Sequence, residues 1–261
     1  MAAIGVLGAG TWGMALARML CNRGHDVEVW SALPEEIEVL AVTGRHPKLE
    51  NMVLPQALRY TKSIQEVCTD KEVLLFAVPS VFVRSTAKAA CPYVSKGQVI
   101  VDVAKGIEPG SLFTLTQVIQ DELSLRRELS DVKLVALSGP THAEEVAVDL
   151  PTTIVAACED MKAARQVQKI FMNPKFRVYT NEDIHGVEIC GAFKNIIALA
   201  TGIARGRGYG DNTAAALITR GVREVSRLGE LMGCRPDTFN GLAGIGDLIV
   251  TCTSRHSRNL T

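Results

Sequence analysis

Residues 4–13 read IGVLGAGTWG, an apolar stretch that runs directly into a glycine-rich turn. The apolar part predicts a buried strand, and the pattern of residues 12–23 predicts an amphipathic helix. Between these two elements, Gly8, Gly10 and Gly13 follow the spacing G-x-G-x-x-G. A glycine turn that leaves a strand and opens a helix in this way is typical of a fold that binds a dinucleotide.

Each glycine has its own role in such a turn. Gly8 permits the tight turn, Gly10 lets backbone amides approach a pyrophosphate, and Gly13 lets the helix pack close to the strand. The N-terminus of the helix then faces the negative charge of the ligand. We therefore expect a nicotinamide dinucleotide, NAD or NADP, at this end of the strand.

Short apolar runs alternate with helical patterns through the first half of the chain. The runs that we predict to be strands are Ile4–Leu7, Val27–Trp30, Val73–Val78, Val99–Val103, Lys133–Leu137 and Thr153–Ala157. Unbroken apolar strands such as VLLFAV fit a parallel sheet that is buried on both faces, and the intervening helices imply right-handed βαβ crossovers. The sequence therefore predicts an α/β fold with a Rossmann-like, doubly wound parallel sheet.

Near Val187 the pattern changes to long helices. One mostly apolar helix is predicted to end at Gly206, and a second is predicted over Thr213–Met232. We therefore expect a dinucleotide-binding domain over residues 1–182, followed by an all-helical and incomplete substrate domain over residues 183–261. Two further glycine clusters follow no strand, and we expect both to be loops between helices. These clusters are Gly206/Gly208/Gly210 and Gly241/Gly244/Gly246.

Composition narrows the function classes. Hydrophobic residues make up 47% of the chain and the formal net charge is zero, so no global field favours nucleic acid or an anionic membrane. We expect no signal peptide, because a predicted strand begins almost at the first residue, and no membrane span, because no apolar run approaches the roughly 20 residues required. The seven cysteines are scattered and form no CxxC pair, which indicates a reducing cytoplasm with neither disulfides nor a metal site.

The far end of the cofactor is not determined by the sequence. In NAD-binding folds an acidic residue after the second strand usually binds the ribose 2′-hydroxyl. The residues that follow that strand here are Ser31, Ala32 and Leu33. Glu28 lies in the middle of the strand, Glu35 and Glu36 are expected to begin a helix after Pro34, and no arginine is present to receive a 2′-phosphate. The choice between NAD and NADP stays open.

Two lysines are candidates for acid/base chemistry. Hydride transfer to a carbonyl needs a proton donor at the developing alkoxide, and none of the five histidines has an evident carboxylate to orient it. Lys105 follows the strand VIVDVA, at the edge where open α/β sheets bind ligands. Lys194 lies in the apolar segment EICGAFKNIIALA, where it either extends to solvent or acts as the acid/base. We favour the second role, because desolvation and a second cation would both lower its pKa.

A series of motifs extends this interpretation along the chain. They are GAGTWG, AKGIE, SGPTHAEEV, FRVYTNEDIHGVEICGAFKNIIALATGI, ALITRG, GLAGIGDL and TCTSRHSRN. In this order and essentially end to end, the chain resembles the bacterial type of NAD(P)-dependent glycerol-3-phosphate dehydrogenase. The resemblance implies reversible reduction of dihydroxyacetone phosphate to sn-glycerol 3-phosphate in the cytoplasm, for glycerophospholipid synthesis. It also implies a family length that this chain does not reach. A homodimer is one option, and the sequence leaves the oligomeric state open.

The resemblance implies roles for individual residues. Lys194 matches the general acid/base, and Lys105 matches a residue that contacts both cofactor and substrate. The cofactor contacts that it implies are Gly8, Gly10, Thr11, Trp12, Gly13, Lys105, Ala143 and Arg258. The substrate contacts that it implies are Lys105, Gly139, Thr141, Lys194, Asp247, Ser257, Arg258 and Asn259. Arg258 supplies the guanidinium that a phosphate dianion needs.

Simpler explanations exist for several of these residues. The stretch SRHSRN is also typical of a solvated polar loop, and Thr141 with Glu144 forms a helix capping box. Asp247 is either a loop residue or the group that orients the amine of Lys194. Ala32 stands where many family members carry a basic or imidazole side chain, which leaves the preference for a 2′-phosphate in doubt.

Two other functions fit part of the pattern. A β-hydroxyacid dehydrogenase shares a Rossmann domain and a lysine-bearing helical domain, but its substrates carry a carboxylate, and GLAGIGDL with SRN argues against it. A regulatory protein could bind NAD(H) without turnover, but it would have no need of both Lys105 and Lys194.

Overall fold

One eight-stranded sheet organises the part of the chain that the computed structural model describes, which is residues 1–254 and 257. Its strands are β1 (Ala3–Leu7), β2 (Asp26–Trp30), β3 (Arg59–Thr61), β4 (Val73–Phe76), β5 (Val99–Asp102), β6 (Lys133–Ser138), β7 (Thr152–Ala157) and β8 (Phe176–Asn181). They lie in the order β3-β2-β1-β4-β5-β6-β7-β8, and all neighbours are parallel except β6 and β7. The predicted Rossmann-like, doubly wound sheet is confirmed.

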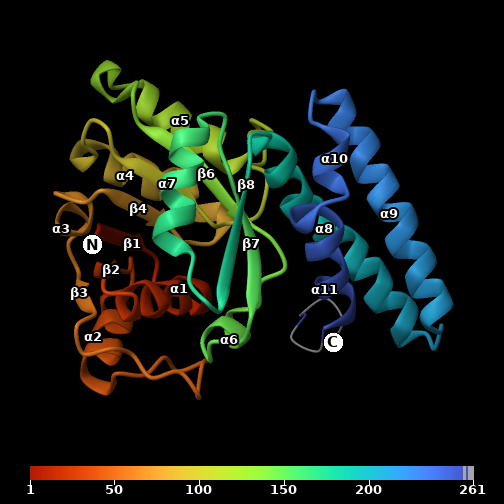
Figure 1. Ribbon diagram of the computed structural model, residues 1–261, viewed down its shortest axis with the longest axis horizontal. Helices are drawn as coiled ribbons and strands as arrows, with labels where there is room; N and C mark the ends of the chain where they lie inside the picture. Colours follow the sequence, from red (N-terminus) through yellow and green to blue (C-terminus); the bar gives the residue numbers. More distant parts are fainter. Residues whose placement is uncertain (255–256, 258–261) are drawn as a thin grey trace.

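Helices cover both faces of the sheet (Figure 1). They are α1 (Thr11–Asn22), α2 (Pro34–Thr43), α3 (Ile64–Cys68), α4 (Val83–Ala90), α5 (Leu115–Ser124), α6 (Ala143–Val146) and α7 (Met161–Phe171), with short turns η1 (Ser80–Phe82), η2 (Cys91–Tyr93) and η3 (Arg127–Leu129). In β4, Val73 and Leu75 join the core under α1, α2, α6 and α7, whereas Leu74 and Phe76 join the core under α3, α4 and α5. Because successive side chains of a strand point to opposite faces, a sheet covered on both sides needs an unbroken apolar run.

The direction of β7 departs from the predicted all-parallel sheet. β7 runs antiparallel to β6, with Leu137 opposite Ala156. The connection between the two strands holds only α6, a helix of four residues. A parallel pair is usually joined by a full crossover helix, and without one this connection returns the chain antiparallel. The longer α7 then crosses from β7 to a parallel β8.

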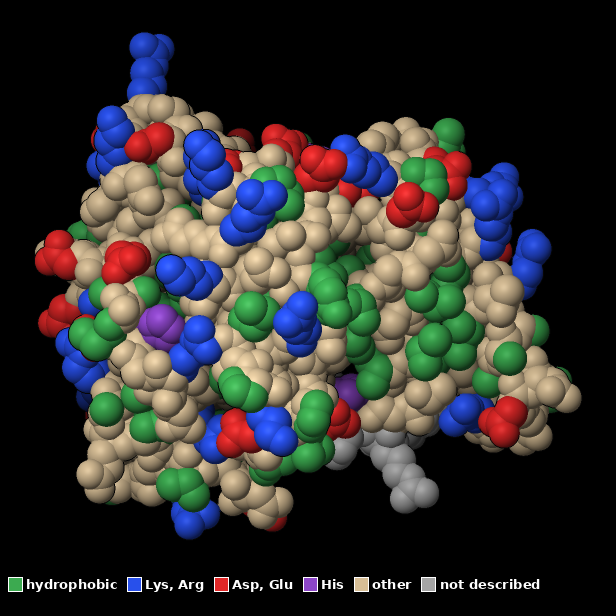
Figure 2. Space-filling model, in the orientation of Figure 1, with side chains coloured by type: hydrophobic (Ala, Val, Ile, Leu, Met, Phe, Trp, Pro, Cys, Tyr) green, Lys and Arg blue, Asp and Glu red, His purple; other side chains and the backbone are tan. Residues whose placement is uncertain are grey.

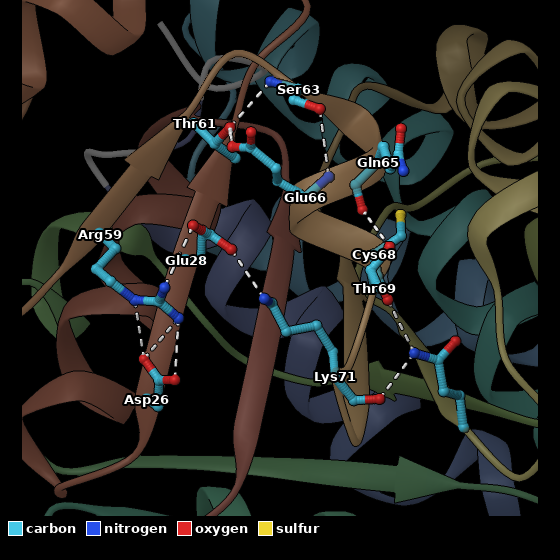
Figure 3. Close-up of polar contacts among 11 residues, drawn as sticks. Asp26, Glu28, Arg59, Thr61, Ser63, Gln65, Glu66, Cys68, Thr69 and Lys71 are labelled. Atoms are coloured by element: carbon cyan, nitrogen blue, oxygen red, sulfur yellow. Dashed lines mark hydrogen bonds and ion pairs between the residues drawn. The ribbon is translucent and has the colours of Figure 1, made fainter.

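The edge strand β3 was not predicted, because it has only three residues and none of the apolar character of its neighbours. Charged side chains secure it to the sheet (Figure 3). Arg59 of β3 pairs with Asp26 at 2.9 Å and with Glu28 at 3.6 Å, and Lys71 pairs with Glu28 at 2.8 Å. Glu28, in the middle of β2, therefore forms ion pairs with both Arg59 and Lys71.

A helical part follows the sheet and lies to one side of it (Figure 1). It consists of α8 (Ile184–Gly206), α9 (Asp211–Leu231), α10 (Pro236–Phe239), the wide helical turn η4 (Leu242–Gly246) and α11 (Asp247–Thr253). The two long helices agree with the predicted ones within three residues at each end. The domain boundary between residues 182 and 183 stays a prediction.

One of the two glycine clusters expected to be loops is a loop, and the other is not. Gly208 and Gly210 lie in the connection between α8 and α9. Gly244, in contrast, lies inside η4, which runs directly into α11. A Cβ at Gly244 would lie 2.1 Å from the carbonyl oxygen of Phe239, so glycine lets this turn pack against the end of α10. Close packing of the backbone against Phe239, rather than loop flexibility, therefore explains why glycine occupies position 244.

The helix α8 is apolar over a longer stretch than we predicted. By length and composition alone this helix could cross a membrane, contrary to our expectation that no run approaches such a length. It packs instead against β6, α9 and α11, and its fully buried positions include Ile189 and Thr201. Other apolar side chains of the helix are exposed, among them Ile196, Leu199 and Ile203. Figure 2 shows apolar side chains gathered over the helical part, at the right of the view.

Candidate active site

The glycine turn lies between β1 and α1, as predicted. Gly8 has a φ of +120°, and a Cβ there would lie 2.6 Å from the carbonyl oxygen of Ala77. A Cβ at Gly13 would lie 2.3 Å from the carbonyl oxygen of Gly8. Around Gly10, no described atom lies within 4 Å of the position that a Cβ would take. The turn thus leaves an open approach to backbone amides at the N-terminus of α1, which fits the pyrophosphate of a dinucleotide.

Two lysines from distant parts of the chain meet at one carboxylate. Lys105 follows β5, and its Nζ donates to Oδ2 of Asp247 at 2.5 Å. Lys194 comes from α8, and its Nζ donates to Oδ1 of Asp247 at 2.8 Å. Asp247 is the first residue of α11, and its side chain is only 1% exposed. Each carboxylate oxygen therefore fixes one ammonium group, where the sheet and the helical part meet.

This environment changes the acidity of Lys194. Burial lowers the pKa of Lys194 to about 8, and the positive charge of Lys105 acts in the same direction, whereas Asp247 opposes both. A lysine with a pKa near 8 can hold or release a proton close to neutral pH. Two lysines and one aspartate leave a net positive charge at the site, which favours an anionic ligand.

Thr251 is a member of this cluster that the sequence interpretation missed. Its hydroxyl accepts a hydrogen bond from Nζ of Lys194 at 2.9 Å and donates one to the backbone oxygen of Asp247 at 2.7 Å. Thr251 lies four residues after Asp247 on α11, so both face Lys194 from one side of that helix. This spacing could have found Thr251 if GLAGIGDL had been interpreted as leading into a helix.

The turn after β6 contributes to the same site. The backbone oxygen of Gly139 accepts from Nζ of Lys105 at 3.2 Å and from the hydroxyl of Thr141 at 3.1 Å. Ala143 is the buried first residue of α6. The predicted capping box of Thr141 and Glu144 is wrong, because α6 begins one residue later than that motif requires, with His142 at its N-cap. The hydroxyl of Thr141 bonds within the turn instead.

Three predicted substrate residues come from the end of the chain. Ser257 is buried, its backbone N–H donates to the oxygen of Ser254 at 3.1 Å, and its hydroxyl has no partner among the described residues. Arg258 and Asn259 lie outside the described residues, so the phosphate contacts that we expect of them stay predictions. Among residues 1–254 and 257, no group of three or more His, Cys, Asp or Glu side chains could hold a metal ion.

Comparisons with known proteins agree along the whole chain. Residues 3–164 match the family model of the NAD-dependent glycerol-3-phosphate dehydrogenase N-terminus, and residues 183–261 match that of the C-terminus. The chain is 63% identical to a glycerol-3-phosphate dehydrogenase [NAD(P)+] of Lactobacillus delbrueckii subsp. bulgaricus, over 99% of this chain and 77% of that protein. It is 48% identical to the Bacillus subtilis enzyme of that name, over 99% of this chain and 74% of that one.

Solved structures give the same result. The crystal structure of glycerol-3-phosphate dehydrogenase from Coxiella burnetii has a TM-score of 0.93 to this chain at 36% sequence identity. The alignment covers 99% of this chain and 78% of the Coxiella protein. The glycine turn, the fold and the motifs that run from one half to the other thus agree with one assignment. The chain belongs to the family of NAD-dependent glycerol-3-phosphate dehydrogenases.

Proposed function

We propose that the protein reversibly reduces dihydroxyacetone phosphate to sn-glycerol 3-phosphate, with Lys194 as the general acid/base, and so supplies the backbone of glycerophospholipids. The observation that carries this proposal is the pair of ammonium groups, Lys105 and Lys194, held on the single buried carboxylate of Asp247. The names of the relatives identify the substrate class, and the positive charge of this cluster suits a phosphate ester. The seven cysteines are free and buried, which supports a cytoplasmic location.

The cofactor would bind along the glycine turn. The space that Gly8 and Gly13 leave, and the open approach at Gly10, fit the pyrophosphate. Thr11 and Trp12 form the first turn of α1, whose free backbone amides face that position. By the resemblance, Ala143 and Arg258 also contact the cofactor. When bound, the reduced nicotinamide supplies the hydride for the substrate carbon.

In this proposal Lys194 supplies the proton. An ammonium group has three N–H donors, and Asp247 and Thr251 accept from two of them. We assign the third to the substrate oxygen, which takes the proton from Nζ as the carbonyl becomes an alcohol. In the reverse direction the neutral amine of Lys194 accepts the hydroxyl proton. Asp247 and Thr251 keep Nζ in place through both steps.

Lys105 would position and polarise the substrate carbonyl. Its Nζ is held by Asp247 and by the backbone oxygen of Gly139, so the ammonium needs little reorganisation when a substrate enters. The substrate phosphate would be bound by Ser257, Arg258 and Asn259, with Gly139 and Thr141 on the opposite side. Binding energy from that phosphate would serve to align the reacting carbon.

Oxidation of the reduced cofactor tests the reaction. Absorbance of NADH and of NADPH is followed after addition of dihydroxyacetone phosphate, and turnover is expected with at least one of them. Reduction of NAD+ or NADP+ by a β-hydroxyacid, with no turnover of dihydroxyacetone phosphate, would indicate the β-hydroxyacid dehydrogenase class. Tight binding of NAD(H) without any turnover would indicate a nucleotide sensor.

Replacement of Lys194 tests the acid/base role. In Lys194→Ala we expect kcat to fall by about 10²–10⁴-fold, because general acid catalysis contributes about that much. The matched control is Lys96→Ala, at an exposed lysine outside the site, and its kcat should equal that of the wild type. Near-normal kcat in Lys194→Ala would remove Lys194 from the mechanism.

A further inference from the structure

We propose that Glu36 is the acidic residue that binds the 2′-hydroxyl of the adenosine ribose, and that it makes this protein prefer NAD(H) to NADP(H). The inference rests on cofactor binding at the glycine turn and goes beyond it, because the turn and the family name leave both cofactors open. A hydroxyl at the ribose 2′ position distinguishes NAD from NADP, which carries a phosphate there.

The first observation is the position of the Glu36 carboxylate. The N–H of Gly8 donates to the oxygen of Trp30 at 2.8 Å, so the end of β2 lies directly beside the glycine turn. Ser31 follows, and its hydroxyl donates to Oε2 of Glu36 at 2.6 Å and accepts from the N–H of Leu33 at 3.1 Å. The first turn of α2 thus returns an acidic side chain to the carboxyl end of β2, where open α/β sheets bind the ribose.

A second observation connects Glu36 with the turn through His46. His46 is a buried residue whose imidazole hydrogen-bonds the backbone of Ala9, inside the glycine turn, and whose charge is also influenced by Glu36. The imidazole therefore lies beside the turn and within the electrostatic range of Glu36. Burial lowers the pKa of His46, so its ring is neutral near pH 7 and offers no cation to a 2′-phosphate.

The other acidic residues near β2 are in different positions. Glu28 pairs with Lys71 and Arg59 near the edge of the sheet, as Figure 3 shows. Glu35 lies next to Glu36 on α2 and is exposed, as Glu36 is, but it is Glu36 that accepts the hydrogen bond from Ser31. Glu36 follows Gly13 by 23 residues, which agrees with the interval of about 20 residues at which a ribose-binding acid usually follows the glycine turn.

The negative charge of Glu36 would then favour binding of NAD over binding of NADP. A carboxylate accepts a charge-assisted hydrogen bond from the 2′-hydroxyl of NAD, and Ser31 holds it ready to do so. The same carboxylate repels the dianionic 2′-phosphate of NADP, and this repulsion weakens the binding of NADP. The positive charge of Lys48 also acts on His46, but the side-chain partner of Glu36 is the neutral hydroxyl of Ser31.

Direct binding measurements test the assignment without any reaction. Isothermal titration calorimetry gives the Kd of NADH and of NADPH for the wild-type protein, and we expect NADH to bind at least about tenfold more tightly. In Glu36→Gln the Kd of NADPH should fall about tenfold or more, while the Kd of NADH rises severalfold. Glu35→Gln, the matched control one residue away, should leave the ratio of the two Kd values unchanged.

A merely structural role of Glu36, as a partner of Ser31 at the start of α2, predicts a different result. The two Kd values would then change together in Glu36→Gln, and that outcome overturns the assignment. Equal or tighter binding of NADPH by the wild type overturns it as well. If Glu36→Gln does not fold, the affinities of the wild-type protein for two cofactor fragments provide the test. We expect 5′-AMP to bind more tightly than adenosine 2′,5′-bisphosphate, and the reverse order would overturn the assignment. Failure of both dinucleotides to bind would contradict the cofactor site itself, whereas a wrong preference contradicts only the role of Glu36.

Discussion

At the scale of single residues, the shared carboxylate of Asp247 predicts how activity depends on pH. Burial and Lys105 lower the pKa of Lys194 to about 8, and reduction needs its protonated form. We therefore expect kcat/KM for dihydroxyacetone phosphate reduction to fall about tenfold from pH 7 to pH 9, because the protonated fraction falls by that factor. Glycerol 3-phosphate oxidation, which needs the neutral amine, should rise over the same interval. Initial rates in both directions from pH 6 to pH 10 check this.

Asp247→Asn identifies the titrating group. The negative charge of Asp247 raises the pKa of Lys194, so its removal should move the midpoint of the profile to lower pH and reduce kcat at every pH. Asp237→Asn, at an exposed position on α10, is the control and should leave the profile in place. A midpoint that does not move in Asp247→Asn would mean that a group other than Lys194 controls the rate.

At the scale of elements, the packing of α9 against α10 depends on one glycine. A Cβ at Gly229 would lie 2.0 Å from Cζ of Phe239, a ring that is 1% exposed. Gly229→Ala therefore overpacks a buried contact, and we expect a net loss of about 1–2 kcal/mol in the free energy of unfolding, after the better helix propensity of alanine is included. Urea unfolding measures this loss.

The matched control for that element is Gly206→Ala, at the last residue of α8. No described atom lies within 4 Å of the position of its Cβ, so the substitution should be neutral or slightly stabilising. Equal stability of Gly229→Ala and Gly206→Ala would show that Phe239 can move aside without cost, and that the α9–α10 contact is looser than the structure indicates.

At the scale of the whole molecule, two buried carboxyl groups couple stability to pH. Glu188 of α8 accepts from the N–H and the hydroxyl of Thr116 on α5, at 2.8 Å and 2.6 Å, so it ties the helical part to the sheet. Burial raises the pKa of Glu188, and burial together with the charge of Glu188 raises the pKa of Asp102 at the end of β5. Both groups therefore bind protons more tightly in the folded state than in the unfolded state.

The sign of the effect follows from linkage. A carboxyl whose folded pKa is raised stabilises the fold below its unfolded pKa, and that contribution is lost as pH rises through the folded value. We expect the free energy of unfolding to fall as the pH rises above the ordinary pKa range of a carboxyl group, by at most about 1.4 kcal/mol per pH unit for each proton. In Asp102→Asn/Glu188→Gln the slope should flatten, whereas in Glu159→Gln, at an exposed site, it should persist. Urea unfolding at pH values above that range gives the slopes, and an unchanged slope in the double variant would assign the pH dependence to other groups.

Much of this architecture was predictable because its signals are local. The glycine spacing at Gly8, Gly10 and Gly13, the apolar runs and the two long helices each depend on residues within one or two turns of the chain. β3 could not be found, because three residues with little apolar character depend on ion pairs from Arg59 to its neighbours. The direction of β7 was also missed, since it is set by the shortness of α6 rather than by the strand itself.

The sequence by itself determined the apolar strands at the centre of the sheet, the glycine turn and the two lysines, because chain-local spacing and apolar burial specify them. Only the tertiary structure decided that both lysines bind the carboxylate of Asp247. Asp247 and Thr251 reach Lys194 from more than 50 positions away in the chain, and Lys105 meets Asp247 across 142. The return of Glu36 to the end of β2 is likewise a matter of how α2 folds back. Charges act through space, so the pKa of a lysine and the charge beside a ribose are set by packing that no local pattern records.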